Sequence, residues 1–182
     1  MAFKDTILTF EDDKIVTDDN MEVMMSWEAP IMEKSAEYVC QSKGDILEIG
    51  FGMGICSDYI QAQGVNSHTI VEIHPQIIEK LKVWAEDKDN VTIVEGDWHN
   101  VELSDSYDGI FIDTYEDSDW SDFKDFVLEK AKKDAKVSYW NAGVTNTYGF
   151  DNFSYEEIPV QVEDNGYYTW YDNIYFMPKV SI

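Results

Sequence analysis

The sequence predicts an α/β protein with three layers, in which a mostly parallel sheet lies between helices and carries a C-terminal antiparallel hairpin. Three observations predict this fold. Apolar strand-like segments alternate with helix-like segments from residue 45 to residue 140, a pattern typical of parallel strands joined by right-handed crossovers. A glycine-rich turn follows the first buried strand. Two aromatic and β-branched segments near the C-terminus have no room for a helix between them.

The central elements are expected in a regular order along the chain. The first strand covers residues 45–50, and its helix, at residues 55–63, ends at Gly64. Pro75 suits the first turn of the next expected helix, at residues 75–84. The remaining strands and helices are expected at residues 67–73, 75–84, 91–95, 107–113, 120–133 and 136–140.

The C-terminal part breaks the alternation. Residues 155–162 and 171–179 are strand-like, and Glu163-Asp164-Asn165-Gly166 between them carries turn residues. We therefore expect an antiparallel hairpin at the edge of the sheet.

The N-terminal part also differs from the rest. Residues 1–22 mix charged and apolar side chains and contain the turn signals Asp12-Asp13 and Asp18-Asp19-Asn20. They predict an arm or lid, followed by one domain at residues 23–182. Pro30 begins a helix that reaches Cys40.

Composition places the chain among folded proteins of one domain. It has 182 residues, 44% of them hydrophobic and 14% aromatic, which is enough to bury a core. No apolar run approaches the roughly 20 residues that span a bilayer, and the charged N-terminus does not resemble a signal peptide. The expected location is cytoplasmic, without a membrane partner.

Charge is the unusual property of this chain. There are 37 acidic and 13 basic residues, for a formal net charge of −24, and every basic residue is lysine. Such a surface repels phosphate backbones, so nucleic acid is not an expected partner. A cationic small-molecule substrate would be attracted. The acidity is also explained by solubility or a saline habitat.

Cysteine and histidine residues do not predict a metal site. Cys40 and Cys56 lie on separate expected helices without metal-ligand spacing, so both are expected to be reduced and buried. The scattered His68, His74 and His99 are expected at the surface or behind a binding site, not as metal ligands.

The glycine-rich turn has the form of a nucleotide-cofactor loop. Glycines at 50, 52 and 54 allow positive φ and a close approach of backbone to a ligand. The dinucleotide fingerprint requires a sixth-position glycine, where Ile55 stands, and no Gly-Lys-Ser/Thr follows for a triphosphate. A tight turn without a ligand is the alternative.

Acidic residues lie at the ends of three expected strands. Glu72 closes the second strand at a distance from the glycine loop that suits contact with ribose hydroxyls, Asp97 follows the third and Asp113 closes the fourth. In an open parallel sheet, ligands bind beyond the carboxyl ends of the strands. Each acid alone is typical of a turn or cap, but together with the loop they favour a nucleoside site.

Three segments together resemble a known enzyme family. The loop, with Glu48 before it, resembles that of class I S-adenosylmethionine-dependent methyltransferases. Residues 25–32 (MSWEAPIM), 47–54 (LEIGFGMG) and 107–115 (YDGIFIDTY) together resemble guanidinoacetate N-methyltransferase and related arginine N-methyltransferase domains. The resemblance runs from about residue 10 to the C-terminus. It implies a Rossmann-like methyltransferase sheet and S-adenosylmethionine as cofactor.

The resemblance also implies roles for individual residues. Glu28 and Asp113 match the two carboxylates that hold the guanidino group, with Tyr115 beside them, and Ala142 and Gly143 match backbone that meets the other end of the substrate. The resemblance implies these cofactor-binding residues: Met24, Met32, Phe51, Gly52, Met53, Gly54, Ile55, Cys56, Glu72, Ile73, His74, Trp98 and His99. Asp97 is added to them because it follows the end of a strand.

The chemistry of a guanidinium explains why two carboxylates would be needed. Its pKa above about 12 makes deprotonation at neutral pH cost roughly 7 kcal/mol, so the proton should leave during methyl transfer. We expect Asp113 to accept it and Glu28 to orient the group through two parallel hydrogen bonds. Guanidinoacetate, arginine, another small guanidine or amine, protein arginine, and a non-catalytic binding module all remain open.

Overall fold

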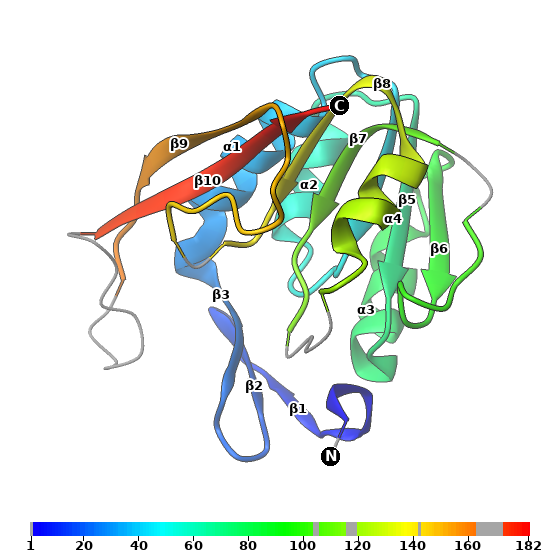
Figure 1. Ribbon diagram of the computed structural model, residues 1–182. Coiled ribbons are helices and arrows are strands. Elements are labelled where there is room, and N and C mark those ends of the chain that lie inside the picture. Colours follow the sequence, from blue (N-terminus) through cyan, green and yellow to red (C-terminus); the bar gives the residue numbers. More distant parts are fainter. Residues whose placement is uncertain (1, 104–105, 116–119, 142, 163–172) are drawn as a thin grey trace.

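The computed structural model describes residues 2–103, 106–115, 120–141, 143–162 and 173–182 (Figure 1). A seven-stranded sheet has the strand order β6-β5-β4-β7-β8-β10-β9. Its strands are β4 (Asp45–Ile49), β5 (Ser67–Glu72), β6 (Val91–Glu95), β7 (Tyr107–Ile112), β8 (Ala131–Tyr139), β9 (Phe153–Pro159) and β10 (Ile174–Ser181).

Helices cover both faces of this sheet. The helices are α1 (Ala29–Val39), α2 (Ile55–Ala62), α3 (Pro75–Ala85) and α4 (Phe123–Lys130). Ile46 and Phe111 pack with α1 and α2, and Ile70 of the same face packs with α3. Ile110 and the opposite face pack against α4. The predicted three-layer α/β fold is confirmed.

The strand directions also match the prediction. Strands β4 to β8 pair in parallel, whereas β10 runs antiparallel to both β8 and β9. Ile174 pairs with Pro159 at one end of the β9–β10 ladder and Val180 with Phe153 at the other. The hairpin thus lies at the sheet edge, and the expected turn at residues 163–166 lies outside the described residues.

The hairpin strands are shifted by two or three residues from their expected bounds, and the largest difference from the sequence prediction lies between α4 and β8. The helix expected at residues 120–133 ends at Lys130, and β8 starts at Ala131 instead of residue 136. Lys132 explains the early strand, because its Nζ lies 2.7 Å from Asp108 Oδ2 on the adjacent strand β7 and 2.6 Å from Asp45 Oδ2 on β4, the next strand beyond it. These ion pairs hold in the sheet a segment whose composition suits a helix.

The N-terminal segment is more regular than a loose arm. It contains the short helix η1 (Phe3–Asp5) and a three-stranded antiparallel sheet of β1 (Leu8–Phe10), β2 (Lys14–Thr17) and β3 (Glu22–Met25). The predicted turns at residues 12–13 and 18–20 connect these strands. The short helix η2 (Ser26–Glu28) then leads directly into α1.

Buried side chains correct one expectation and agree with another. Cys40 and Cys56 are free thiols in the core, as predicted. His68, expected at the surface or behind a site, is fully buried, and its Nε2 lies 2.9 Å from Glu48 Oε2. In the described ranges, no group of three or more His, Cys, Asp or Glu side chains could hold a metal ion.

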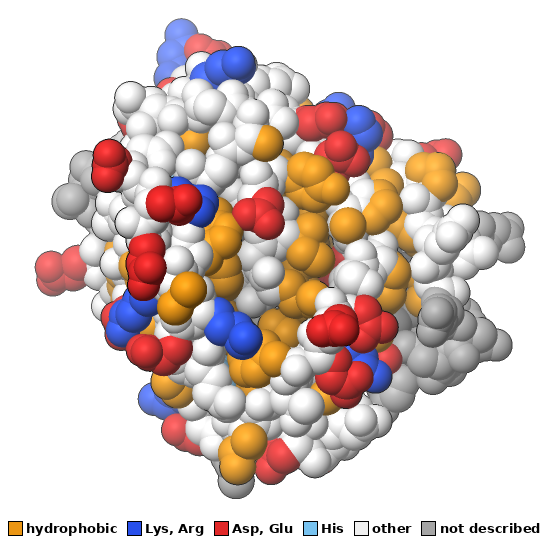
Figure 2. Space-filling view, turned by 180° about the vertical axis from the view of Figure 1, so that it is seen from behind, with side chains coloured by type: hydrophobic (Ala, Val, Ile, Leu, Met, Phe, Trp, Pro, Cys, Tyr) orange, Lys and Arg blue, Asp and Glu red, His pale blue; other side chains and the backbone are white. Residues whose placement is uncertain are grey.

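The surface reflects the excess of acids. Figure 2 shows, on the face opposite to that of Figure 1, acidic side chains scattered around a central band of hydrophobic ones, with fewer lysines. Among the helices of the described chain, none has the length and apolar character needed to cross a lipid bilayer.

Candidate functional site

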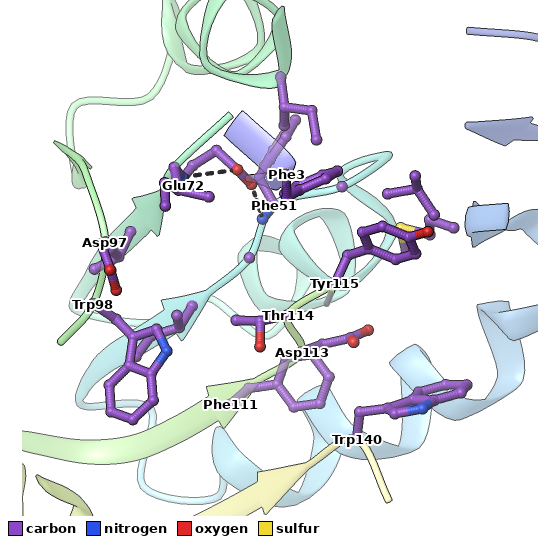
Figure 3. A pocket seen from close by; sticks show the side chains of 18 of the residues that line it. Phe3, Phe51, Glu72, Asp97, Trp98, Phe111, Asp113, Thr114, Tyr115 and Trp140 are labelled. Atoms are coloured by element: carbon purple, nitrogen blue, oxygen red, sulfur yellow. Dashed lines mark hydrogen bonds between the residues drawn. The ribbon is translucent and has the colours of Figure 1, made fainter. Parts of the chain in front are cut away.

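A cavity of about 890 Å³ lies beyond the carboxyl ends of the parallel strands (Figure 3). Residues after β4, β5, β6 and β7 line it, and the N-terminal segment and the start of α1 contribute further residues. Glu72 and Asp97 lie on one side of it, and Asp113 and Tyr115 lie on the other. The position agrees with the general rule for ligand sites in open α/β sheets.

The glycine loop forms one wall through backbone that has no side chain in the way. Gly50 has φ 90° and Gly52 has φ 55°, both in the left-handed region. A Cβ on Gly50 would collide with the carbonyl oxygen of Asp113, and one on Gly52 would collide with Met24 Sδ. The Met53 N–H also donates to Met24 Sδ at 3.1 Å. The loop is therefore closely packed between β7 and β3.

Glu72 is a buried carboxylate fixed by backbone donors. It accepts N–H hydrogen bonds from Phe51 at 2.9 Å, and from Ile73 and His74 at 2.8 Å each. Burial raises the pKa of Glu72, and these hydrogen bonds oppose the rise. The side chain is thus held in one orientation at the cavity wall, as contact with ribose hydroxyls requires.

The segment after β6 supplies a polar and an aromatic contact. Asp97 Oδ1 lies 2.7 Å from His99 Nδ1 and also accepts the His99 N–H at 3.0 Å. Partial burial acts to raise the pKa of Asp97, but the bonds from His99 outweigh it, so the pKa lies below its usual value. The Trp98 ring lies 3.8 Å from the His99 ring, centroid to centroid. The segment after β6 therefore contributes a hydrogen-bond acceptor, Asp97, and the flat ring of Trp98 to the cavity.

Glu28 and Asp113 reach the same cavity from distant parts of the chain. Glu28 ends η2, and its Oε1 accepts the Met25 N–H at 2.8 Å. Asp113 follows β7, where its own N–H donates to the Ile49 carbonyl at 2.9 Å. Both side chains line the cavity. The two carboxylates therefore line the same cavity, as the sequence-based mechanism requires.

Both carboxylates have raised pKa values. For Glu28, burial raises the pKa well above its usual value, and the negative charges of Asp113 and Glu22 add to it, whereas the Met25 N–H lowers it. For Asp113, burial and then the negative charge of Glu48 raise the pKa to about 7. A bound cation at this end of the cavity would lower both pKa values.

The structure brings together many of the expected site residues. The following line the cavity: Met24, Glu28, Met32, Phe51, Gly52, Cys56, Glu72, Ile73, Asp97, Trp98, His99, Asp113 and Tyr115. Others do not line it: Met53, Gly54, Ile55, His74 and Gly143. His74 instead accepts the Gln76 N–H at the start of α3 and packs against Phe3 at 4.9 Å between ring centroids. Ala142 lies outside the described residues.

The cavity also contains residues that the sequence did not indicate. Phe3 packs against Tyr115 at 4.9 Å between ring centroids and lies over the glycine loop. Glu22 enters from β3 and Trp140 from the end of β8. Tyr175 of β10 supports Trp140, with 5.1 Å between ring centroids. Only Trp140 carried a sequence signal, because it ends a predicted parallel strand.

Comparison with known proteins connects this geometry to a family. The family model for guanidinoacetate N-methyltransferase matches residues 7–158. The chain is 33% identical to protein arginine N-methyltransferase 2 of Aspergillus oryzae, over 98% of this chain and 46% of that protein. It is 37% identical to the protein of the same name from Saccharomyces cerevisiae, over 84% of this chain and 40% of that protein. The chain therefore spans less than half the length of these relatives.

Solved structures agree on the fold. The N-methyltransferase NodS from Bradyrhizobium japonicum WM9, in complex with S-adenosyl-L-homocysteine, superposes with a TM-score of 0.65 at 12% identity, covering 85% of this chain and 87% of that one. Spermidine synthase from Thermotoga maritima superposes with a TM-score of 0.65 at 14% identity, covering 96% and 72%. At such low identity, the two structures support the fold alone.

Proposed function

The chain belongs to the guanidinoacetate N-methyltransferase family, and we propose that it methylates a guanidino nitrogen of a small cationic compound. S-adenosylmethionine is its cofactor and, when bound, supplies an electrophilic methyl group on a sulfonium. The observation that carries the proposal is the convergence of Glu28 and Asp113 in the cavity that also contains the glycine loop and Glu72.

The residues present fit this cofactor. Glu72 would accept hydrogen bonds from the ribose hydroxyls, because backbone donors already hold its carboxylate at the cavity wall. Gly52 lines the cavity, and its positive φ lets the loop present backbone to a ligand there. The apolar side chains of Phe51, Ile73 and Trp98 line the same space and would hold the adenine base of the cofactor.

Glu28 would orient the guanidino group. Its Oε1 is fixed by the Met25 N–H, so the carboxylate cannot rotate freely. A carboxylate and a guanidinium pair through two parallel hydrogen bonds, which fix both position and plane. Such orientation supplies a large share of the rate in a transfer reaction.

Asp113 would accept the proton that leaves the attacking nitrogen. Its pKa of about 7 suits a general base near neutral pH, because about half of the groups are ionised at pH 7 and the carboxylate is more basic than an ordinary one. Tyr115 lies beside it at the cavity (Figure 3). Together, the two carboxylates would also offset the positive charges of the guanidinium and of the sulfonium in a partly dry site.

The test is incubation with methyl-labelled S-adenosylmethionine and a panel of small guanidines and amines. Label in a small guanidine is the expected result. Cofactor binding without any methylated product would instead favour a binding module without catalysis. Label in an amine but in no guanidine would contradict the assignment of the substrate.

Arginine in a protein is a second candidate substrate, favoured by the names of the relatives from Aspergillus oryzae and Saccharomyces cerevisiae. An acidic surface suits a basic peptide. The same labelling experiment separates the two candidates, since a protein substrate would carry the label into the macromolecular fraction.

A further inference from the structure

The indole ring of Trp140 lies at the substrate end of the cavity. The backbone N–H of Trp140 donates to the Ile112 carbonyl at 2.9 Å, which holds Trp140 beside the residue that precedes Asp113. Trp140, Asp113 and Tyr115 line the same cavity. In Figure 3, the Asp113 carboxylate lies between the rings of Tyr115 and Trp140, and Glu72 lies on the other side of the cavity. Trp140 is therefore a neighbour of the proposed base.

Trp140 also packs against the beginning of α1. It contacts one hydrophobic cluster that contains Ile31 and another that contains Met32. Both of these residues lie in the first turn of α1, which begins directly after Glu28. The ring thus lies where the element that carries Glu28 meets the strand end that carries Asp113.

Tyr175 of β10 supports the Trp140 ring. The two ring centroids lie 5.1 Å apart, and the ring planes are 33° apart. Tyr175 is buried, and its hydroxyl oxygen accepts the Asn141 N–H at 2.9 Å. Burial raises the pKa of Tyr175 well above its usual value, the Asn141 N–H opposes the rise, and the negative charges of Asp113 and Glu28 add to it. This pair of rings therefore lies close to both carboxylates.

Two carboxylates do not by themselves distinguish a guanidinium from an ammonium. Both cations donate N–H hydrogen bonds, and both carry one positive charge. The guanidinium differs because it is planar, delocalised and more weakly hydrated, so that it stacks on aromatic rings. An aromatic ring also attracts a cation that lies over its face. An aromatic ring beside the carboxylates can therefore supply a selection that their charge cannot.

We infer, on the basis of the proposed function, that the Trp140 ring packs against the face of the substrate guanidinium, while Glu28 and Asp113 bind its N–H groups. Trp140 is then a specificity-determining residue, which selects a planar guanidinium over an ammonium of the same charge. It takes no part in proton transfer.

The test compares butylguanidine with butylamine, which have the same alkyl tail and are both cations at about pH 8. Dissociation constants are measured by calorimetry with S-adenosylhomocysteine present, and kcat and KM for butylguanidine are measured with S-adenosylmethionine. The unaltered protein should bind butylguanidine about tenfold more tightly than butylamine. Equal affinity for the two cations would contradict the selection.

The variant Trp140→Leu removes the ring and keeps an apolar side chain. It should weaken butylguanidine binding about tenfold and butylamine binding about twofold or less, with the S-adenosylhomocysteine affinity unchanged. The loss of kcat/KM should come mainly from KM. Trp140→Phe keeps a smaller ring beside Tyr175 and should retain a preference of about threefold for the guanidine.

The matched control is Phe176→Leu. Phe176 is a partly buried aromatic residue next to Tyr175 on β10, packs against Tyr155 and does not line the cavity. Its replacement removes a ring from the same strand without changing the cavity wall. Both cations should therefore bind this variant as they bind the unaltered protein.

Three results with the variants would overturn the inference. Equal losses for butylguanidine and butylamine in Trp140→Leu would show a general packing role. Weaker S-adenosylhomocysteine binding by that variant would assign Trp140 to the cofactor. Where Trp140→Leu fails to fold, an unchanged preference in Trp140→Phe would count against the ring. Binding of S-adenosylhomocysteine to the unaltered protein without binding of either cation would remove the proposed function as well, a result distinct from lost selectivity.

Discussion

The two ends of the cavity differ in how many hydrogen-bond donors stabilise their carboxylates. At the cofactor end, Glu72 accepts three backbone N–H hydrogen bonds within the described structure. At the substrate end, Glu28 has one such donor, and each influence on the pKa of Asp113 raises it. The first end is organised before any ligand binds, whereas the carboxyls of the second are neutralised by protonation or by a bound cation. Carboxyls with few hydrogen-bond donors thus mark the substrate end.

Asp113→Asn should produce the largest change, because it removes the proposed base at the substrate end. We expect kcat to fall about 10³-fold, within the range for loss of a general base, with the dissociation constant of S-adenosylmethionine unchanged. Steady-state kinetics and calorimetry measure the two quantities. Asp125→Asn, at an exposed acid of α4, is the control. A variant with kcat within tenfold of the original would remove Asp113 as the base.

Glu28→Gln should have the next largest effect. Glutamine keeps an acceptor for the Met25 N–H, so the local structure should persist, but the charged pair with the guanidinium is lost. We expect kcat/KM to fall about 100-fold, mainly through KM for the guanidine. Glu37→Gln on the exposed side of α1 is the control. An unchanged KM would show that Glu28 does not hold the substrate.

Glu72→Ala tests the organised end of the cavity. We expect the dissociation constant of S-adenosylmethionine to rise about tenfold, because the acceptor for ribose hydroxyls is gone. Calorimetry measures the change, and turnover at saturating cofactor should be largely retained. Glu95→Ala, an exposed residue at the end of the neighbouring strand β6, should bind the cofactor normally. Equal affinity in the two variants would exclude Glu72 from the cofactor site.

The smallest expected effect is on stability. Because the folded-state pKa of Asp113 is about 7 and the usual value is 3.8, the unfolded state ionises first as the pH rises. The folded state therefore loses stability between about pH 4 and pH 7. A shift of about three pKa units corresponds to about 4 kcal/mol at pH 8. Because burying the Asn amide costs part of this gain, Asp113→Asn should be more stable than the original protein by roughly 1–2 kcal/mol at pH 8, and by less at pH 5. Urea unfolding without cofactor measures this difference, and equal differences at the two pH values would contradict the raised pKa.

Sequence patterns predicted the parts of the fold that depend on local periodicity. The alternation of strands and helices from β4 to β8 is visible in short windows, and the parallel arrangement follows from general connection rules. Asp113 could be placed at the cavity for the same reason, since it follows a strongly apolar strand. The early start of β8 could not, because the ion pairs of Lys132 with Asp45 and Asp108 are long-range contacts.

The N-terminal contributions to the site were hidden for a similar reason. Strands β1 to β3 have only three or four residues each, too few for a clear period. Phe3 of η1 and Glu22 of β3 line the cavity, and Met24 of β3 contacts the glycine loop through its sulfur. Nothing in the sequence surroundings of Phe3 and Glu22 distinguishes them from other residues of a charged arm.

The absence of arginine from the whole chain has a practical consequence for the pair Glu28 and Asp113. No side chain of this polypeptide possesses a guanidino group, so none can occupy the site of a guanidino substrate. For the same reason, one copy of the chain cannot methylate a guanidino group of another. Radioactivity found on guanidino nitrogen of any macromolecule in a purified reaction must then originate from an added acceptor, which removes self-labelling as a source of background.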